Sequence, residues 1–315
     1  MPKVSIIIPV YKAERTIERC LQSIIAQTYS DWESICINDG SPDCSVRILE
    51  QYALRDNRIK VYSKPNGGVA SARQFGVERA TGDYAIHVDP DDWVDSDMLE
   101  SLVTQAHASK ADVVICDFFQ ELPGQSVLIK QCPSSLDAAI VARELFQQLH
   151  GSCCNKLIAS AYYKSVSFVP GLNHSEDVLY NCKILQKNPV ISYLPRAFYH
   201  YEVTDTSITK TYTADIFYQL NSVYGELLKL FVDDAITTEH ILNHRAILLS
   251  ALGTRVDKFN ATDVTKIVGD VRGQIWKSTR LTRYRKLEII AFLSGFRIIS
   301  VCMRRFHNLV NQFRR

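Results

Sequence analysis

The sequence predicts an α/β fold: an open, mostly parallel, Rossmann-like sheet flanked by helices, followed by a helical C-terminal extension. Three observations predict it. Strand-like and amphipathic helical segments alternate over the first 116 residues. The strand-like segments are rich in β-branched residues, as in strands that are covered on both faces. Polar loops follow the carboxyl ends of these segments, which is where such sheets bind ligands.

The alternation begins with the run Val4–Pro9, and apolar spacing from Ala13 to Gln27 predicts the first helix. Further strands are expected at 32–37, 59–62, 84–88 and 112–116, and further helices at 46–52, 71–80 and 97–107. Beyond Phe118 the alternation fails. Helices at 136–150 and 176–186 and one or two strands at 190–201 are expected there, then a polar loop at 204–210 and helices at 216–231 and 238–259. The expected divisions are therefore 1–116, 117–211 as the second half of the same domain, and 212–315.

The cysteines and the N-terminus indicate a cellular compartment. The nine cysteines form no C-x-x-C pair, and most lie in apolar runs, so we expect buried thiols in a reducing compartment and no disulfide framework or zinc site. The apolar run from Val4 to Ile8 is interrupted by Pro9 and is too short for a signal peptide. These features predict a cytoplasmic protein.

The C-terminal tail is strongly basic. Residues 272–315 contain eleven Lys and Arg against one acidic residue, a charge of +10, and the whole chain carries +2, so the preceding 271 residues sum to −8. Such a tail suits an anionic surface, either membrane lipid or nucleic acid. Its apolar residues from Leu287 to Val301 are too interrupted for a membrane span, and we favour an interfacial helix on anionic lipid. A helix packed on its own domain, or a homodimer contact, is the alternative.

Three carboxylates, Asp89, Asp91 and Asp92, follow the expected strand at 84–88. Because like charges this close repel one another, a cation is expected among them. Oxygen ligands on a short turn suit Mg²⁺ or Mn²⁺, which often join protein carboxylates to substrate phosphates. The alternative is an acidic cluster that caps the next helix.

Five segments occur in a recognisable order: Val4–Tyr11, Ile37–Ser41, Asn66–Arg73, Ala80–Asp83 and Asp89–Trp93. In their residues, order and spacing they resemble the family 2 glycosyltransferases, enzymes of the GT-A fold that use nucleotide sugars. The resemblance is strong over about residues 1–115. It continues more loosely through 155–157, 176–177 and 199–201 to Ser207, and the last hundred residues match no motif.

The resemblance implies that residues 1–116 bind a nucleotide sugar and residues 117–211 bind the acceptor. It implies these nucleotide-sugar-binding residues: Pro9, Val10, Tyr11, Glu14, Asp39, Asn66, Gly67, Arg73, Asp89, Pro90 and Asp92. Asp39 would accept a hydrogen bond from a uracil ring, and Arg73 would face a phosphate or the carboxylates. Asp91 and Asp89 would hold Mn²⁺ or Mg²⁺, which stabilises the departing diphosphate.

The pair Glu176–Asp177 resembles the acidic pair of this family, one member of which deprotonates the acceptor hydroxyl. We favour Asp177 and keep Glu176 open as the base; helix capping alone could also explain both. His200 is a weaker candidate for a metal or phosphate ligand, and a structural histidine is the favoured reading. His87 departs from the family pattern and could add a titrating group near the metal.

The resulting expectation is an inverting, metal-dependent glycosyltransferase that moves a sugar from a UDP-sugar to a saccharide. A lipid-linked intermediate of bacterial surface polysaccharide, at the inner face of the cell membrane, is the expected acceptor, and no nucleic acid partner is expected. The alternatives are a non-catalytic nucleotide-sugar-binding or assembly protein, and a sugar nucleotidyltransferase. The sequence does not specify the donor sugar or the linkage.

Overall fold

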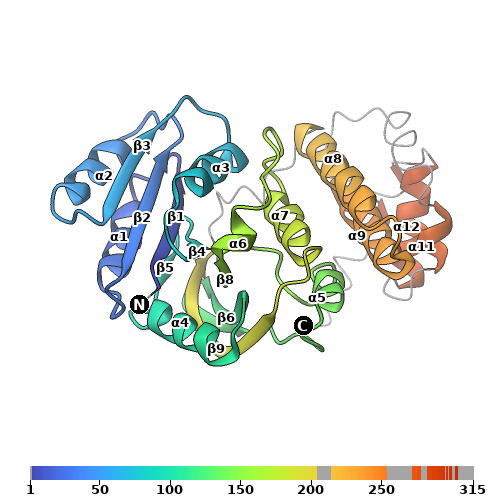
Figure 1. The fold of residues 1–315 in the computed structure, drawn as a ribbon. Helices are drawn as coiled ribbons and strands as arrows, with labels where there is room; N and C mark the ends of the chain where they lie inside the picture. The colour runs from blue at the N-terminus through green and yellow to red at the C-terminus, as the bar shows by residue number, and fades with distance from the viewer. Residues whose placement is uncertain are drawn as a thin grey trace. The chain divides into compact units, whose positions relative to one another are not determined.

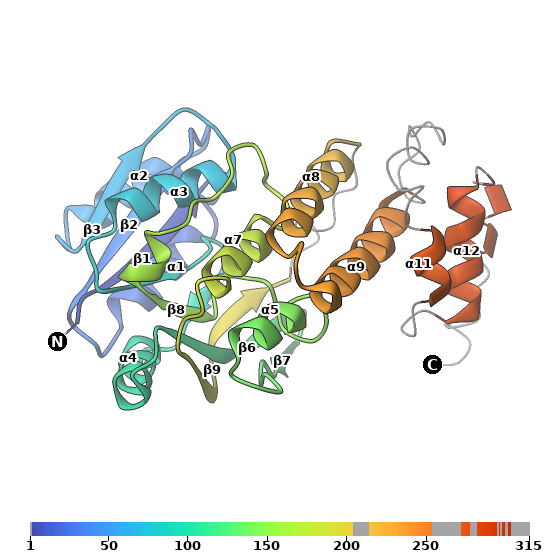
Figure 2. The same cartoon turned by 45° about the vertical axis from the view of Figure 1, so that its right-hand side comes forward.

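The computed structural model describes residues 2–203, 214–253, 272–277, 282–294, 296, 298–299 and 302–303 (Figures 1 and 2). The chain divides into two compact units, Met1–Ser207 and Ile208–Arg315. The polar loop expected at 204–210 and the end of the helix expected at 238–259 lie outside the described residues.

The first half of the N-terminal unit follows the expected alternation. Its elements are β1 (Val4–Val10), α1 (Ile17–Ile25), β2 (Trp32–Asn38), α2 (Ser45–Ala53), β3 (Ile59–Ser63), α3 (Val69–Arg79) and β4 (Tyr84–His87). These strands are parallel and lie in the order β3-β2-β1-β4. Because crossovers are right-handed and the strand order reverses after β3, α1 and α2 cover one face and α3 the other (Figures 1 and 2).

The second half of this unit is a mixed sheet. Its elements are β5 (Trp93–Val94), α4 (Met98–Ser109), β6 (Val113–Leu122), β7 (Gln125–Ile129), α5 (Ala138–Glu144), β8 (Lys156–Ala159), α6 (Ser160–Tyr163), α7 (Glu176–Leu185) and β9 (Ile191–Glu202). The sheet continues from β4 as β8-β6-β9-β5, with β7 paired to β6. Since β8 runs antiparallel to both β4 and β6, the expected parallel order holds from β3 to β4 and for the pair β6 and β9.

Two elements differ from the sequence-based expectation. The strand expected at 112–116 continues to Leu122 and returns as β7, because the turn before Gln125 is short enough for an antiparallel hairpin. The helix expected at 136–150 ends at Glu144. The chain turns after it, so that the backbone N–H of His150 donates to Gln131 Oε1 at 2.6 Å.

The core explains the strand composition. All seven residues of β1 and all seven of β2 are buried, as the β-branched runs predict for strands covered on both faces. Helix α1 buries Ile17, Cys20, Leu21 and Ile24 against this sheet. The buried sheet fixes the positions at which its strands end, and the polar loops begin there.

The C-terminal unit is helical in its described part. It contains α8 (Ala214–Leu230), α9 (Ala235–Gly253), α11 (Arg272–Lys277) and α12 (Arg283–Leu293), with α8 against α9 and α12 against α9 and α11. On α12, Glu288 and Ile289 are buried and Leu287 is exposed. This segment of the expected interfacial helix therefore packs on its own unit. Among the described residues, no helix has the length and apolar character needed to cross a membrane.

His87, at the end of β4, lies in the core. Its ring packs edge-on against Phe168 and Tyr180, with centroids 5.7 and 6.2 Å away. Burial lowers its pKa to about 3, assisted by the charge of Arg73. The idea that His87 titrates near the metal is therefore wrong, because the buried ring stays neutral at physiological pH.

Replacing His87 with Leu should remove an acid-dependent loss of stability. The folded pKa of about 3 lies below the unfolded value of about 6.5, so the unfolded state binds more protons and stability falls as pH drops from 6.5 toward 3. Urea unfolding at pH 7 and pH 5.5 measures this effect. The free energy of unfolding of His87→Leu, relative to the wild type, should rise by about 1 kcal/mol at the lower pH. An unchanged difference would show that this ring is not held neutral.

Candidate active site

Asp39, just after β2, binds the loop before α3. Its Oδ1 accepts hydrogen bonds from Lys64 Nζ at 2.6 Å and from the Gly67 N–H at 3.0 Å, and its Oδ2 accepts one from the Gly68 N–H at 2.8 Å. Gly68 has a φ of +84°, and a Cβ there would lie 2.2 Å from Asn173 Oδ1, so only glycine fits. A carboxylate oxygen accepts two hydrogen bonds, which leaves Oδ2 one position for a ligand.

The other residues expected at a base pocket differ in exposure. Pro9 and Val10 are buried in β1, whereas Tyr11 is 45% exposed and can meet a ring. Asn66 is exposed and donates to the backbone just after β2 at 3.0 Å. Glu14 is exposed and accepts a hydrogen bond from the backbone at the start of α2 at 3.1 Å. Tyr11, Glu14 and Asn66 therefore form the accessible part of this group.

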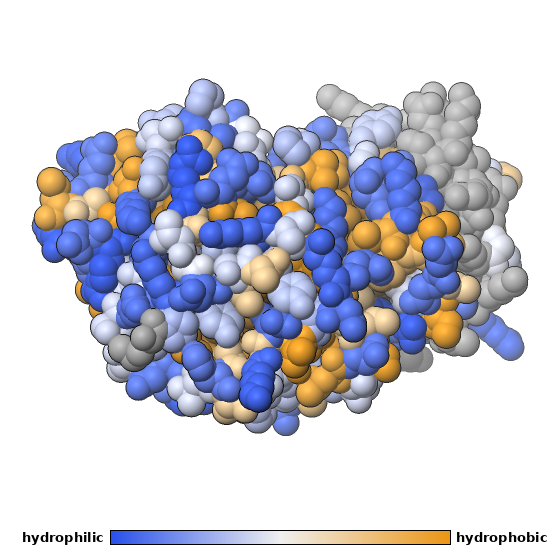
Figure 3. Space-filling view, viewed as in Figure 1, coloured by the Kyte–Doolittle hydropathy of each residue, from blue (hydrophilic) through white to orange (hydrophobic). Residues whose placement is uncertain are grey.

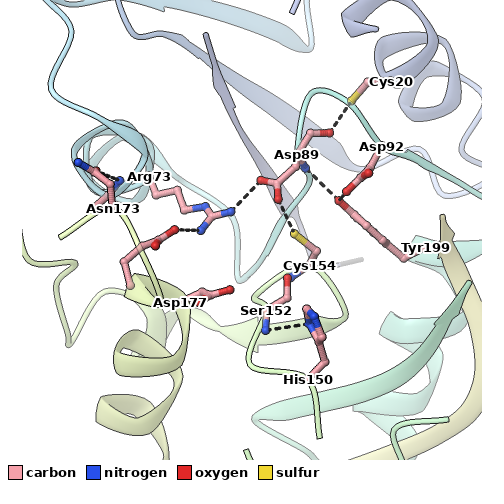
Figure 4. Close-up of polar contacts among 12 residues, drawn as sticks. Cys20, Arg73, Asp89, Asp92, His150, Ser152, Cys154, Asn173, Asp177 and Tyr199 are labelled. Carbon is pink, nitrogen blue, oxygen red and sulfur yellow. Dashed lines mark hydrogen bonds and ion pairs between the residues drawn. The ribbon is translucent and has the colours of Figure 1, made fainter. Parts of the chain in front are cut away.

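The three carboxylates after β4 have three different environments, and Figure 4 shows those of Asp89 and Asp92. Asp92 is buried and accepts hydrogen bonds from the Glu202 N–H at 2.9 Å and from the Tyr199 hydroxyl, so it fastens the turn to β9. Burial, with Asp89 and Asp91 nearby, raises the pKa of Asp92. In this structure the Asp92 side chain therefore holds the turn against β9.

Asp91 is the available carboxylate of the turn. Arg19 donates to the backbone carbonyl oxygen of Asp91, and no side chain among the described residues donates a hydrogen bond to the Asp91 carboxylate. Burial, then the charge of Asp89, raises the pKa of Asp91 to about 6. The charge of Arg19 opposes this shift without cancelling it, and a partly buried carboxylate with a raised pKa is a favourable place for a cation.

Arg73 on α3 is buried between two acids (Figure 4). Its Nη2 donates to Asp89 Oδ1 at 2.8 Å and its Nη1 donates to Glu176 Oε1 at 2.6 Å. Burial opposes its charge, but these two carboxylates raise the pKa of Arg73 well above its usual range. Arg73 therefore faces the carboxylates, one of the two arrangements expected for it, and joins α3, the acidic turn and α7.

Glu176 and Asp177 open α7 but differ in their contacts. Glu176 is buried on Arg73, and burial raises its pKa while Arg73 opposes the shift. Asp177 is partly exposed and points into the hollow beside Asp89 and Ser152 (Figure 4). Among the described residues its only hydrogen-bond donor is the N–H of Val178, at 2.8 Å. Asp177 is thus the member of the pair that a bound hydroxyl can reach.

The residues fit a metal site in which the protein supplies only some of the ligands. In the described portion of the chain, no three His, Cys, Asp or Glu side chains gather closely enough to hold an ion. Asp89 differs from Asp91, since Arg73 binds its Oδ1 and the Cys154 thiol lies 3.6 Å from its Oδ2. Asp91 alone is available, and Mg²⁺ commonly takes one or two protein carboxylates and fills its other positions with phosphate and water.

His200 belongs to a stack of rings. It lies between Trp93 and Phe119, with centroids 4.9 and 5.0 Å away, and the Arg19 guanidinium covers the far face of Trp93. Its nitrogens meet carboxylate oxygens of Glu121 and Asp95 at 2.7 and 3.2 Å. This environment is that of a structural histidine. Pro90, in the turn between Asp89 and Asp91, is partly exposed.

Sequence reasoning missed residues that hold the site together. Lys64, Cys154, Tyr199 and Arg19 contact Asp39, Asp89, Asp92 and the Asp91 carbonyl oxygen, respectively. Lys64 directly precedes the Pro-Asn-Gly-Gly loop, a position that could have suggested a role. Tyr199 lies in the segment 199–201 that shares the looser resemblance, but nothing local linked it to Asp92. Cys154 and Arg19 lie in no matched segment, and their partners are distant in the sequence.

These features define a class: a sheet whose parallel strands end in polar loops, an acidic turn after β4, and an acidic pair at the start of α7 that Arg73 joins to this turn. A crystal structure of S. aureus TarS residues 1–349 with UDP-GlcNAc has the same fold, with a TM-score of 0.74 at 19% identity over 97% of this chain and 92% of that one. The mannosyltransferase PcManGT from Pyrobaculum calidifontis, with GDP-Man and Mn²⁺, matches at a TM-score of 0.50 and 14% identity, over 97% and 84% of the two chains. The fold is therefore GT-A.

Sequence comparison identifies the family. Residues 5–151 match the model of glycosyl transferase family 2. The uncharacterized glycosyltransferase EpsJ of Bacillus subtilis (strain 168) is 33% identical over 67% of this chain and 64% of its own length. Glycosyltransferase GlyA of Streptococcus pneumoniae serotype 4 is 27% identical over 78% of this chain and 37% of its own. The chain belongs to glycosyltransferase family 2, and its matches span less than two thirds of these relatives.

Removing Arg73 should destabilise the N-terminal unit strongly. The change Arg73→Met leaves the buried Glu176 and the partly buried Asp89 without a counter-charge, which should cost about 3–5 kcal/mol of unfolding free energy. Urea unfolding at neutral pH measures it, with Arg79→Met on the same helix as the control. A loss no greater than that of the control would contradict the role of Arg73 as the buried counter-ion.

Proposed function

We propose that the protein is an inverting, metal-dependent glycosyltransferase that moves a sugar from a UDP-sugar to a saccharide hydroxyl. One observation supports this most: Asp91, in the turn after β4, and Asp177, beside the buried Arg73–Glu176 pair (Figure 4), are carboxylates that form no ion pair with a described residue. The first suits a cation at the donor diphosphate, and the second suits a base at the acceptor.

The donor would lie along the strand ends of the parallel half. Tyr11 would pack on the base, and Asp39 Oδ2 would accept the uracil N3–H at its remaining position. TarS, the structural neighbour with a TM-score of 0.74, has been crystallised with UDP and with UDP-GlcNAc, which supports a uridine donor here. We infer a UDP-sugar on this combined basis.

Asp177 would act as the general base. Its carboxylate takes the proton of the acceptor hydroxyl as that oxygen bonds to the anomeric carbon, on the face opposite the diphosphate. The bond from the anomeric carbon to the diphosphate oxygen breaks, and its electron pair leaves with UDP. A single displacement needs no protein nucleophile, so the anomeric configuration inverts.

Asp91 would hold a divalent cation together with the donor diphosphate. Such an ion supplies Lewis-acid stabilisation of the leaving UDP. The Mn²⁺ present with GDP-Man in PcManGT supports Mn²⁺ or Mg²⁺ as the cofactor. Arg73 would hold Asp89 in the turn and keep Glu176 away from the acceptor.

The change Asp177→Asn should abolish transfer while sparing donor binding. General bases contribute about 10²–10⁴-fold, so UDP release with acceptor present should fall by at least about 100-fold. UDP release from UDP-GlcNAc, UDP-glucose and UDP-galactose with Mn²⁺, with and without acceptor saccharide, measures it, and Asp177→Glu is the matched control. Unchanged release would remove Asp177 from the mechanism. Pyrophosphate from UTP and sugar phosphate would instead indicate a nucleotidyltransferase.

The acceptor would be presented at an anionic membrane, as a lipid-linked saccharide of surface polysaccharide. Apolar side chains reach the surface of the C-terminal unit beside charged ones (Figure 3), among them Trp276, Leu287, Phe296, Ile298 and Ile299. The +10 charge of residues 272–315 adds attraction to anionic headgroups. We propose peripheral binding at the inner face of the membrane.

Neutralising the tail should weaken binding to anionic vesicles. Each basic residue near such a surface contributes about 1 kcal/mol, so Arg304→Gln with Arg305→Gln should lower the partition coefficient by about tenfold or more. Co-sedimentation with phosphatidylglycerol-containing vesicles measures it, with Arg47→Gln plus Arg55→Gln as a charge-matched control. Equal co-sedimentation of the two double variants would refute a membrane-binding tail.

A further inference from the structure

Two buried polar side chains hold the segment 150–154, between α5 and β8, by hydrogen bonds to its backbone. Lys156 Nζ donates to the carbonyl oxygens of His150 and Ser152 at 2.9 and 2.6 Å. Asn181 Nδ2, on α7, donates to the Gly151 carbonyl oxygen at 2.7 Å. Lys156 and Asn181 are 3% and 2% exposed, so a buried network fixes three successive carbonyls of this segment.

The same segment borders both acidic groups of the site. A Cβ on Gly151 would lie 2.2 Å from Val178 Cγ2, so the backbone packs against the residue that follows Asp177. At its other end, the Cys154 thiol lies 3.6 Å from Asp89 Oδ2. The segment therefore lines the hollow into which Asp177 points (Figure 4).

His150 is the side chain that this segment presents. Its ring is exposed, and its centroid lies 5.2 Å from that of Phe118 and 6.3 Å from that of Tyr201. Surrounding atoms lower its pKa by desolvation, against the charge of Asp177, which favours a neutral ring. Nδ1 accepts the Ser152 N–H at 3.2 Å, so the neutral ring carries its proton on Nε2.

The Nε2–H has no hydrogen-bond partner among the described residues. A fixed hydrogen-bond donor next to an aromatic ring suits a sugar-binding site, because pyranoses offer hydroxyl oxygens at their edge and C–H groups on their face. The nearby carboxylates of Asp89 and Asp177 would repel an acidic sugar, so the complementary ligand is neutral.

We propose that His150 binds the saccharide acceptor: its Nε2–H donates to one hydroxyl of a neutral pyranose, and the sugar face lies on the His150 and Tyr201 rings. A neighbouring hydroxyl of the same sugar then meets Asp177. This inference rests on the proposed function and adds to it the class of acceptor and a residue that selects it. Lys156 and Asn181 serve as positioning residues for this contact.

Saturation-transfer NMR tests the proposal without turnover. Methyl glycosides of glucose, galactose and N-acetylglucosamine are titrated into the full chain with UDP and Mn²⁺ present. At least one should bind the wild type, and His150→Ala and His150→Phe should both weaken it by about tenfold, since Phe keeps a ring but lacks the donor. His107→Ala, at an exposed position on α4, is the matched control and should bind as the wild type does.

The outcomes separate this inference from the proposed function. Equal binding by the wild type and His150→Phe, or binding of none of the glycosides to the wild type, overturns the assignment of His150. UDP affinity, measured on the same samples by calorimetry, should be unchanged in all variants. Failure of the wild type to bind UDP would contradict the proposed function, independently of the result for His150.

Discussion

The buried guanidinium of Arg73 is the interaction on which the site depends. It comes from α3, in the parallel half of the sheet, and contacts Asp89 after β4 and Glu176 at the start of α7. Glu176 lies 103 residues after Arg73 in the sequence, and no other ion pair among the described residues joins α7 to α3 or to the acidic turn. An isolated buried charge would be costly, and two carboxylates at 2.8 and 2.6 Å offset that cost.

The balance of charge around Arg73 has a chemical consequence. One cation faces two acids directly, and Asp91 and Asp177 add two further carboxylates that form no ion pair with a described residue. Each acidic group thus supplies one residue that fixes the structure and one that remains available. The arrangement would suit a divalent cation at the turn and a proton at α7, the two positive charges on which the proposed sugar transfer depends.

Much of this could be predicted from the sequence, because some signals are local. The alternation over the first half gave β1 to β4 and α1 to α3 correctly, and the positions of Asp39 and of the acidic turn follow from where strands end. Other features depend on contacts between distant residues. Strand β8 lies between β4 and β6, and Lys64 donates a hydrogen bond to Asp39. No local sequence pattern predicts either of these contacts.

The difference between paired acids also required the structure. Asp89 and Asp91 are equivalent as a motif, as are Glu176 and Asp177, and only the reach of Arg73 separates them. His87 shows the reverse case. Its position beside the acidic turn suggested chemistry, but its side chain points into the core and packs edge-on against the stacked rings of Phe168 and Tyr180.

The most direct test of the central claim is a crystal structure of the protein soaked with UDP and Mn²⁺, with the ion located by its anomalous signal. The account predicts manganese bonded to the Asp91 carboxylate and to the diphosphate, with Arg73 still paired to Asp89 and Glu176 and the uracil beside Asp39. Manganese bound away from Asp91, or a nucleotide that displaces Arg73 from both carboxylates, would contradict it.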